Sequence, residues 1–359
     1  MTALDRFFEI SARGSTVAAE LRGGAVTFIA MAYIIVLNPI ILSSTADIAG
    51  HKLAFGQVSA VTSLAAGAMT ILFGVVARLP FAFAAGLGIN SFLASSVVGV
   101  LTWPEAMGLV VIEGLIIVAM AVTGLRRMIF DAVPMPLKLA ITAGIGLFIM
   151  FIGLVNAGFV SSTGHPSPPL GLGAGGTGSV RAIPTLIFVF TLLTSGVLVA
   201  RKVRGGILIG LISGTVVAAA VEAIWHLGSA TEKPGGWSLS VPALTGSPFA
   251  VPNLSLIGHV DFGSFGRIGA IAALMLVFTL LFTNFFDAMG TMTGLSRQAG
   301  LADEHGNFPR LQSALVIEGT GAVVGGAVSA SSNTVFVESG TGIGEGARTG
   351  LASLVTGGL

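Results

Sequence analysis

Two polar residues, Asn284 and Asp287, interrupt the apolar stretch Leu276–Gly294. Because they are three residues apart, they share one face of a helix. A charged side chain at the centre of a membrane helix costs about 2.5–3.5 kcal/mol on insertion scales. We therefore expect Asp287 to face a protein-lined or water-filled cavity and to have a function there.

Other polar residues also lie within apolar segments: Asn38, Asn90, Glu113, Glu318 and Glu338. Glu113 and Glu318 lie deep in apolar helices, and we interpret both as making structural hydrogen bonds to a neighbouring helix. Asn38 is interpreted as a helix cap or packing residue. Asp287 and Glu338 stand beside glycines at which helix breaks are predicted, so at least one of them is expected to contact substrate.

The remaining titratable residues favour neither a metal site nor hydrolytic chemistry. Glu105 and Glu222 lie near span ends and are expected to be solvated. The five histidines lack metal-ligand spacing, so we expect neither metal nor cofactor: His51, His165, His226, His259 and His305. An intramembrane aspartyl protease needs two membrane aspartates, and only Asp287 qualifies. The sequence has no G-x-x-x-x-G-K-[ST] motif and so encodes no P-loop ATPase module. If the protein is a transporter, its transport must be gradient-driven or passive.

The composition is that of a polytopic membrane protein whose main solvent is the lipid bilayer. Of the 359 residues, 53% are hydrophobic and 9% are charged, against about 25% charged in soluble domains. The 51 glycines indicate close helix packing or broken helices. The absence of cysteine excludes disulfides, and a net charge of +1 gives no reason to invoke nucleic acid.

Ten apolar segments are long enough to cross a membrane. They are Gly24–Leu42, Val58–Val76, Phe81–Val100, Ala106–Val122, Leu137–Val155, Thr185–Ala200, Gly206–Ile224, Ile268–Met289, Leu311–Val328 and Asn333–Gly346. Arg348–Leu359 resembles the first half of an eleventh span, so we expect a C-terminally truncated chain.

The positive-inside rule gives this layout an orientation. With the N-terminus in the cytoplasm, 13 of the 17 Lys and Arg residues fall inside. The other four fall outside: Lys52, Arg181, Lys233 and Arg267. We therefore expect a multi-pass protein of the inner cell membrane with a cytoplasmic N-terminus.

Two of the segments are unusual, Phe81–Val100 and Asn333–Gly346. Each begins with β-formers or aromatic residues and continues into a glycine cluster that a straight helix disfavours. We align the clusters A-G-L-G-I-N (Ala85–Asn90) and S-G-T-G-I-G (Ser339–Gly344). Paired helices that are broken at glycines mark the substrate site in inverted-repeat transporters. The alternative interpretation is that these two segments are glycine-rich packing helices.

Four motifs together resemble the nucleobase–cation symporter 2 family, and more closely its adenine/guanine/hypoxanthine permease branch. They are Gly23–Pro39, Ala85–Asn90, Phe285–Thr291 (F-F-D-A-M-G-T) and Val337–Gly350 (V-E-S-G-T-G-I-G-E-G-A-R-T-G), in this order. The resemblance implies an all-α membrane fold of about fourteen segments, arranged as two inverted repeats of seven. It also implies a core domain, a gate domain and two broken helices with short strands.

Placing the chain on this plan gives five expected regions, with ten to eleven of the segments present. Residues 1–22 form a cytoplasmic N-terminal segment, and residues 23–123 form core segments one to four. Residues 124–227 form gate segments five to seven, and residues 228–266 form an extracytoplasmic loop. Residues 267–359 form core segments eight to eleven, with the last incomplete and the remaining gate segments missing.

The resemblance further implies a secondary transporter, not an enzyme, that imports a purine nucleobase together with H⁺. Na⁺ is the alternative coupling ion, and a homodimer is one possible assembly. The substrate-binding positions carried over are Asn90, Asn284, Asp287, Glu338 and Gly340. The family's eighth segment reads D-x-x-D-T-x-G-T, and here Asn284 and Ala288 depart from it. Its ninth segment carries Asp where this chain has Glu318.

These residues suggest how a purine would be bound. Glu338 would accept from ring N–H groups, backbone N–H groups around Gly340 would bind acceptors, and Asn90 and Asn284 would read the base edge. Asp287 is the first candidate for the proton-coupling group, with Glu338 the second. Phe81, Phe83 and Phe92 would stack on the base or belong to the core, and we favour the core. A sulfate or bicarbonate carrier of the same fold is disfavoured because its site would need positive charge.

Overall fold

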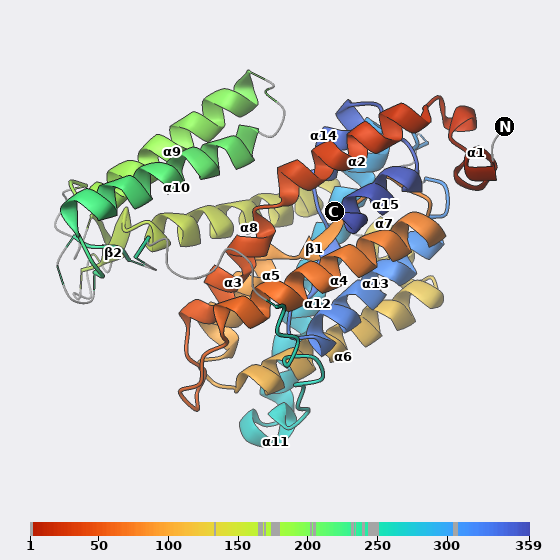
Figure 1. Cartoon of the computed structure of the whole chain (residues 1–359). Helices are drawn as coiled ribbons and strands as arrows, with labels where there is room; N and C mark the ends of the chain where they lie inside the picture. Colours follow the sequence, from red (N-terminus) through yellow and green to blue (C-terminus); the bar gives the residue numbers. More distant parts are fainter. Residues whose placement is uncertain are drawn as a thin grey trace. The chain divides into compact units, whose positions relative to one another are not determined.

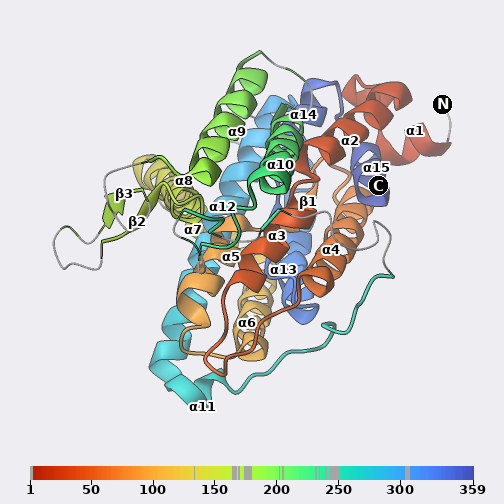
Figure 2. The same ribbon diagram turned by 60° about the vertical axis from the view of Figure 1, so that its left-hand side comes forward.

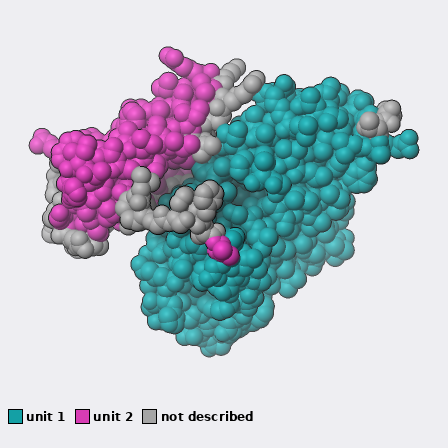
Figure 3. Space-filling view, in the orientation of Figure 1, with its two compact units in different colours: residues 1–145, 252–359 teal, residues 146–251 magenta. Residues whose placement is uncertain are grey.

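The computed structural model describes residues 3–132, 134–163, 168, 170–173, 180–201, 203, 206–230, 233, 235–238, 241–242, 251–303 and 308–359. His165 and His305 lie outside the described residues. The chain divides into two compact units (Figure 3). The first comprises Met1–Ile145 and Pro252–Leu359, and the second comprises Gly146–Val251.

Helices make up most of the described chain (Figure 1). In the first unit they are α1 (Ala3–Phe8), η1 (Ser11–Arg13), α2 (Val17–Met31), α3 (Ile34–Ser44), α4 (Phe55–Val76), α5 (Leu87–Phe92), the π-helical turn η2 (Leu93–Val97), α6 (Trp103–Val122), α7 (Leu125–Ala132), α11 (Ser264–Ile268), α12 (Ala270–Gln298), α13 (Leu311–Ala327), α14 (Ser339–Gly344) and α15 (Gly350–Gly358). Helix α8 (Met135–Asn156) leads into the second unit. That unit holds α9 (Ile183–Ala200), α10 (Gly206–Trp225) and a hairpin of β2 (Val160–Ser162) and β3 (Leu170–Leu172).

Five helical stretches among the described residues are long and apolar enough to span a membrane. They are Val17–Ser44, Phe55–Val76, Trp103–Val122, Ile183–Ala200 and Ala270–Gln298. The first combines α2 and α3, which meet at a turn through Ala32 and Tyr33. The protein is therefore a multi-pass membrane protein, as its composition predicts.

The two glycine-rich segments meet in a short antiparallel pairing at the centre of the first unit. Strand β1 (Phe83–Ala85) pairs with β4 (Asn333–Val335), with Ala84 opposite Thr334. A backbone this deep in a membrane must have its hydrogen bonds satisfied within the protein. Pairing the strands supplies some of these bonds, and the Thr70 and Ser339 hydroxyls accept from the Phe83 and Ala82 N–H groups, each at 2.9 Å. The predicted broken helices with short strands are thus confirmed.

Two details of the sequence prediction were wrong. The aligned clusters are not equivalent, because Ala85 ends strand β1 whereas Ser339 begins helix α14. Three residues separate β4 from α14, and only Gly86 separates β1 from α5. The predicted break beside Asp287 is also absent, since α12 runs without interruption from Ala270 to Gln298. A single glycine costs a helix only about 1 kcal/mol, which packing can offset.

Glycines also allow α6 and α13 to pack at short range. A Cβ on Gly114 would lie 2.5 Å from the Val323 backbone nitrogen, and one on Gly319 would lie 2.9 Å from the Val118 nitrogen. Real side chains do not tolerate such distances, so these positions need glycine. Helix α13 packs against both α6 and α4, and the three helices lie side by side in Figures 1 and 2.

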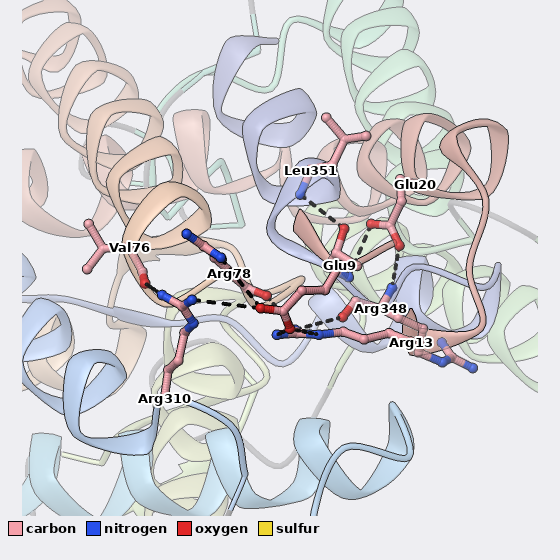
Figure 4. A network of polar contacts seen from close by, with 9 residues as sticks. Glu9, Arg13, Glu20, Val76, Arg78, Arg310, Arg348 and Leu351 are labelled. Carbon is pink, nitrogen blue, oxygen red and sulfur yellow. Dashed lines mark hydrogen bonds and ion pairs between the residues drawn. The ribbon is translucent and has the colours of Figure 1, made fainter. Parts of the chain in front are cut away.

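The N-terminal segment is joined to both halves of the first unit by a polar network (Figure 4). The exposed Glu9 carboxylate pairs with Arg13 at 2.9 Å, Arg78 at 3.5 Å and Arg310 at 3.8 Å. The buried Glu20 carboxylate accepts from the backbone N–H groups of Arg348 at 2.8 Å, Thr349 at 3.2 Å and Ala352 at 3.3 Å. Glu20 on α2 therefore caps the first turn of α15.

Glu105 and Glu222, which were predicted to be solvated, are both engaged by the protein. Glu105 is 3% exposed, forms a capping box with Thr102 and pairs with Arg267 at 2.8 Å. Glu222 accepts from the indole N–H of Trp237 at 2.7 Å. A carboxylate near a helix end can satisfy loop donors as well as meet water, and sequence position alone does not distinguish these outcomes.

Candidate functional site

The five predicted site residues all belong to the first unit, on α5, α12 and around α14. Helix α12 contacts α5, β4 and α14. The β1–β4 pairing holds the two broken segments beside one another, so residues far apart in sequence gather around α12. Their burial separates them into two groups.

Asn90 is fully buried and takes part in a chain of amide contacts. Its Nδ2 donates to Asn38 Oδ1 at 2.6 Å, and Asn38 Nδ2 donates to Thr62 Oγ1 at 2.8 Å and to the Ala330 carbonyl at 3.1 Å. Asn38 is thus a buried packing residue rather than a helix cap. The chain links α5 to α3 and α4, and gives Asn90 a structural environment.

Asn284 is fully buried as well. Its Nδ2 donates to Glu113 Oε1 at 2.8 Å and to Ser332 Oγ at 3.0 Å. Glu113 therefore makes the hydrogen bond to a neighbouring helix that its sequence context predicts. This contact fastens α12 to α6 and to the residue that precedes β4.

Glu338 lies at the start of α14 and is partly exposed. Its Oε1 accepts from the hydroxyl of Tyr33 at 2.6 Å. Tyr33, the only tyrosine in the sequence, lies at the turn between α2 and α3. The sequence analysis missed Tyr33, although a lone phenol within the motif Gly23–Pro39 is a signal that could have found it.

Asp287 lies three residues after Asn284 on α12 and is partly exposed. Helix α12, which carries Asp287, packs against α14, and Glu338 directly precedes α14. The structure therefore brings Asp287 and Glu338 into one neighbourhood, where their carboxylates can accept hydrogen bonds or take up a proton or cation. Asn284 and Asp287 share one face of α12, as the sequence predicts, but only Asp287 is partly exposed.

Gly340 makes local contacts on both sides of its backbone. Its N–H donates to the Val337 carbonyl at 2.9 Å, and its carbonyl accepts from Gln298 Nε2 at 2.8 Å. A Cβ at this position would lie 2.7 Å from Gln298 Oε1. The Gly340 N–H, which we expected to bind a ligand acceptor, is thus engaged in a turn, and Gln298 is a polar neighbour that the sequence analysis missed.

Glu318 forms a fully buried ion pair with Arg126 of α7. Arg126 also donates to the Leu315 carbonyl at 3.3 Å, and its guanidinium carbon lies 5.4 Å from the centre of the Phe285 ring. The sequence analysis counted Arg126 as a charge of an inside loop, whereas the structure places it inside the protein. Glu318 makes the expected contact with a neighbouring element, but the contact is an ion pair.

The aromatic residues considered for stacking are mainly part of the core. Phe81 and Phe83 have no exposed surface and pack with Phe73, and Phe92 is partly buried. Among the residues that the structure describes, no three His, Asp or Glu side chains are grouped to hold a metal ion. The accessible polar groups of the candidate site are thus Tyr33, Asp287 and Glu338, backed by the buried amides.

The fold is that of the inverted-repeat membrane transporters. The transmembrane domain of a cyanobacterial bicarbonate transporter, BicA, matches 94% of this chain and 79% of its own with a TM-score of 0.61. At 16% identity, this likeness shows the fold alone.

The sequence comparison identifies the family. The model of the xanthine/uracil-type permease family matches residues 18–357, and the chain belongs to this permease family. The guanine/hypoxanthine permease PbuG of Bacillus subtilis is 36% identical over 98% of this chain and 75% of its own. The adenine permease AdeP of Escherichia coli is 32% identical over 99% of this chain and 73% of its own. The protein is thus a transporter and not an enzyme, which removes the aspartyl protease hypothesis.

Proposed function

We propose that the protein imports purine nucleobases by symport with protons, with Na⁺ as the alternative coupling ion. The observation that carries the proposal is the pair of accessible carboxylates, Asp287 and Glu338, beside the two broken helices. The similarity to permeases named for guanine, hypoxanthine and adenine supports the choice of substrate.

The proposed roles follow from accessibility. Glu338 accepts from an N–H group of the purine, since a carboxylate is an acceptor of directed hydrogen bonds. Asp287 takes up the coupling proton. Asn90 and Asn284, which are fully buried, act on the site mainly through the helices that they hold, rather than by reading the base edge directly. Gly340 keeps α14 close to Gln298.

The proposed membrane arrangement is that of the sequence analysis. Residues 23–123 and 267–359 belong to the core domain, residues 124–227 belong to the gate, and residues 228–266 form an outer loop. The N-terminus (residues 1–22) lies in the cytoplasm, and the protein resides in the inner cell membrane as a monomer or homodimer. Movement of the core against the gate would give alternating access.

Replacing the proposed proton site tests the coupling. Asp287→Asn keeps the shape of the side chain but removes the ionisable group, so we expect concentrative hypoxanthine uptake to fall to the level seen with a protonophore. The measurement is accumulation of radiolabelled hypoxanthine by the full-length protein in cells lacking their own purine permeases.

The matched control is Asp261→Asn, which alters an exposed loop carboxylate and should leave uptake unchanged. Surviving proton-dependent accumulation in Asp287→Asn would refute the assignment. Adding adenine, guanine, xanthine and uracil as competitors defines the substrate range, and repeating the assay with and without Na⁺ distinguishes the two ions.

A further inference from the structure

We propose that Glu113 is a positioning residue of the coupling site, and that it acts as a neutral carboxylic acid paired with the side-chain amide of Asn284. The pair holds the turn of α12 that carries Asp287 against α6 and against the residue before β4. The inference rests on the proposed function, in which Asp287 takes up the coupling proton.

The Glu113 carboxyl group is buried without a counter-charge. Its side chain has no exposed surface and belongs to α6, which packs against α7, α11, α12 and α13. Among the side chains that the structure describes on these helices, three are basic, and none pairs with Glu113: Arg126, Arg267 and Arg297. The first two pair with other carboxylates, and Arg297 is exposed in the last turn of α12.

The acidic side chains described on the same helices offer no compensation either. Glu105 and Glu318 are each paired with an arginine, and Asp287 on α12 is a further carboxyl group. A buried carboxylate without a cation is very costly, and such a group takes up a proton instead. We therefore place a proton on Glu113.

The hydrogen bonds of Glu113 and Asn284 indicate which atom carries this proton. Asn284 Nδ2 donates to Glu113 Oε1 at 2.8 Å. Two buried oxygens of the same pair, Glu113 Oε2 and Asn284 Oδ1, have no hydrogen-bond partner among the described residues. Both are acceptors when Glu113 is ionised, whereas a proton on Oε2 makes it a donor that suits Asn284 Oδ1. An acid and an amide then form two complementary hydrogen bonds.

The pair joins three elements around the turn that carries Asp287. Glu113 lies on α6 and Asn284 on α12, and Asn284 Nδ2 also donates at 3.0 Å to the hydroxyl of Ser332, which directly precedes β4. Asp287 follows Asn284 by three residues, which is about one turn of helix. The neutral acid thus fixes α12 beside the broken segment, while Asp287 stays partly exposed.

Two variants of Glu113 distinguish a neutral acid from a charged one. Glu113→Gln keeps the shape and carries both a donor and an acceptor, so it can make both bonds to Asn284 and should take up hypoxanthine like the wild type. Glu113→Met has a similar length but makes neither bond. Its uptake should fall by about tenfold or more, because the buried amide of Asn284 loses a partner. The measurement is radiolabelled hypoxanthine uptake by the full-length protein, with KM and maximal rate determined at matched membrane levels.

Exchanging the two groups provides a rescue experiment. Asn284→Asp alone places two carboxyl groups in the buried junction and should lower uptake. In Glu113→Gln/Asn284→Asp, the acid lies on α12 and the amide lies on α6, so one proton again completes the pair. Uptake by this double variant should return toward the wild-type value.

Infrared spectroscopy of the purified protein gives a readout that is independent of transport. At neutral pH, the wild type should show the C=O absorption of a buried protonated carboxyl group that Glu113→Gln lacks. The matched control is Thr279→Ala, which removes an exposed hydroxyl that donates to the Met275 carbonyl within α12. This control should change neither uptake nor the carboxyl absorption.

Three results would overturn the inference while leaving the proposed function intact: loss of uptake in Glu113→Gln, wild-type uptake in Glu113→Met, or identical carboxyl absorption in the wild type and Glu113→Gln. A wild type that takes up no hypoxanthine overturns the proposed function, and the positioning role with it. The infrared difference decides the protonation state of Glu113 in either case.

Discussion

At the scale of single residues, burial divides the polar side chains of the membrane interior by role. Asn90, Asn284 and Glu113 have no exposed surface and bond to neighbouring elements. Asp287 and Glu338 are reachable from outside the protein. The first group supports the packing of its elements, although each of its three side chains keeps one buried oxygen without a hydrogen-bond partner among the described residues. The second group is the more accessible one for chemistry.

The buried ion pair of Arg126 and Glu318 gives a prediction about stability. Removing one partner leaves the other charge unpaired, so Arg126→Met or Glu318→Gln alone should lower the free energy of unfolding by about 3–5 kcal/mol. The double variant Arg126→Met/Glu318→Leu should recover much of this loss. Chemical denaturation of the purified protein in detergent measures the effect.

A surface pair provides the control for this prediction. Arg22, whose side chain is 56% exposed, pairs with Glu345 at 3.0 Å. Arg22→Met should change stability by no more than about 1 kcal/mol. If either single change at the Arg126–Glu318 pair is equally mild, the pair does not carry the stability assigned to it.

At the scale of elements, the β1–β4 pairing and the broken helices that follow it organise the site. Short strands occur here because their backbones can hydrogen-bond to one another, whereas lipid offers no hydrogen-bond partners. Helix α12 passes beside both broken segments without a break, and it carries Asp287. The capping of α15 by Glu20 ties the same region to α2 (Figure 4).

This capping contact predicts a second effect on stability. Glu20→Ala would leave buried N–H groups of Arg348, Thr349 and Ala352 without their acceptor. Because bonds to a charged group contribute about 1.5–3 kcal/mol each, we expect a clear fall in melting temperature. Glu9→Ala, at a 41% exposed carboxylate of the same network, should have a much smaller effect. Equal effects of the two changes would contradict the capping role.

At the scale of the whole molecule, the long apolar helices and the charge distribution together make a multi-pass permease. We propose that the charge bias of the loops orients the chain, because positive residues near span ends are generally retained in the cytoplasm. The boundary between the two compact units lies at Ile145, within α8. The division into a core domain and a gate domain that begins at residue 124 stays a prediction.

The proposed orientation can be tested by labelling, since the natural sequence has no cysteine. Lys52→Cys lies at an exposed position on the proposed outer side, and Arg201→Cys lies at an exposed position on the inner side. A membrane-impermeant maleimide added to intact cells should label the first and not the second. Permeabilised cells should show labelling of both, and the opposite pattern in intact cells would reverse the orientation.

The amino-acid sequence by itself determined the membrane class, the two broken segments and the family. These properties depend on local hydropathy, glycine clusters and ordered motifs, which are legible along the chain. Its errors, such as the break expected beside Asp287, arose where a glycine in the sequence was compatible with two backbones.

Only the tertiary structure decided which polar atoms meet. Tyr33 reaches Glu338 across 305 residues, Arg126 reaches Glu318 across 192, and Asn284 reaches Glu113 across 171. Such contacts depend on how helices pack and rotate against one another, and local sequence does not encode that rotation. The candidate site therefore gained Tyr33 from the structure, as well as the buried contacts of Asn90 and Asn284. Contact of these two amides with the base stays a prediction.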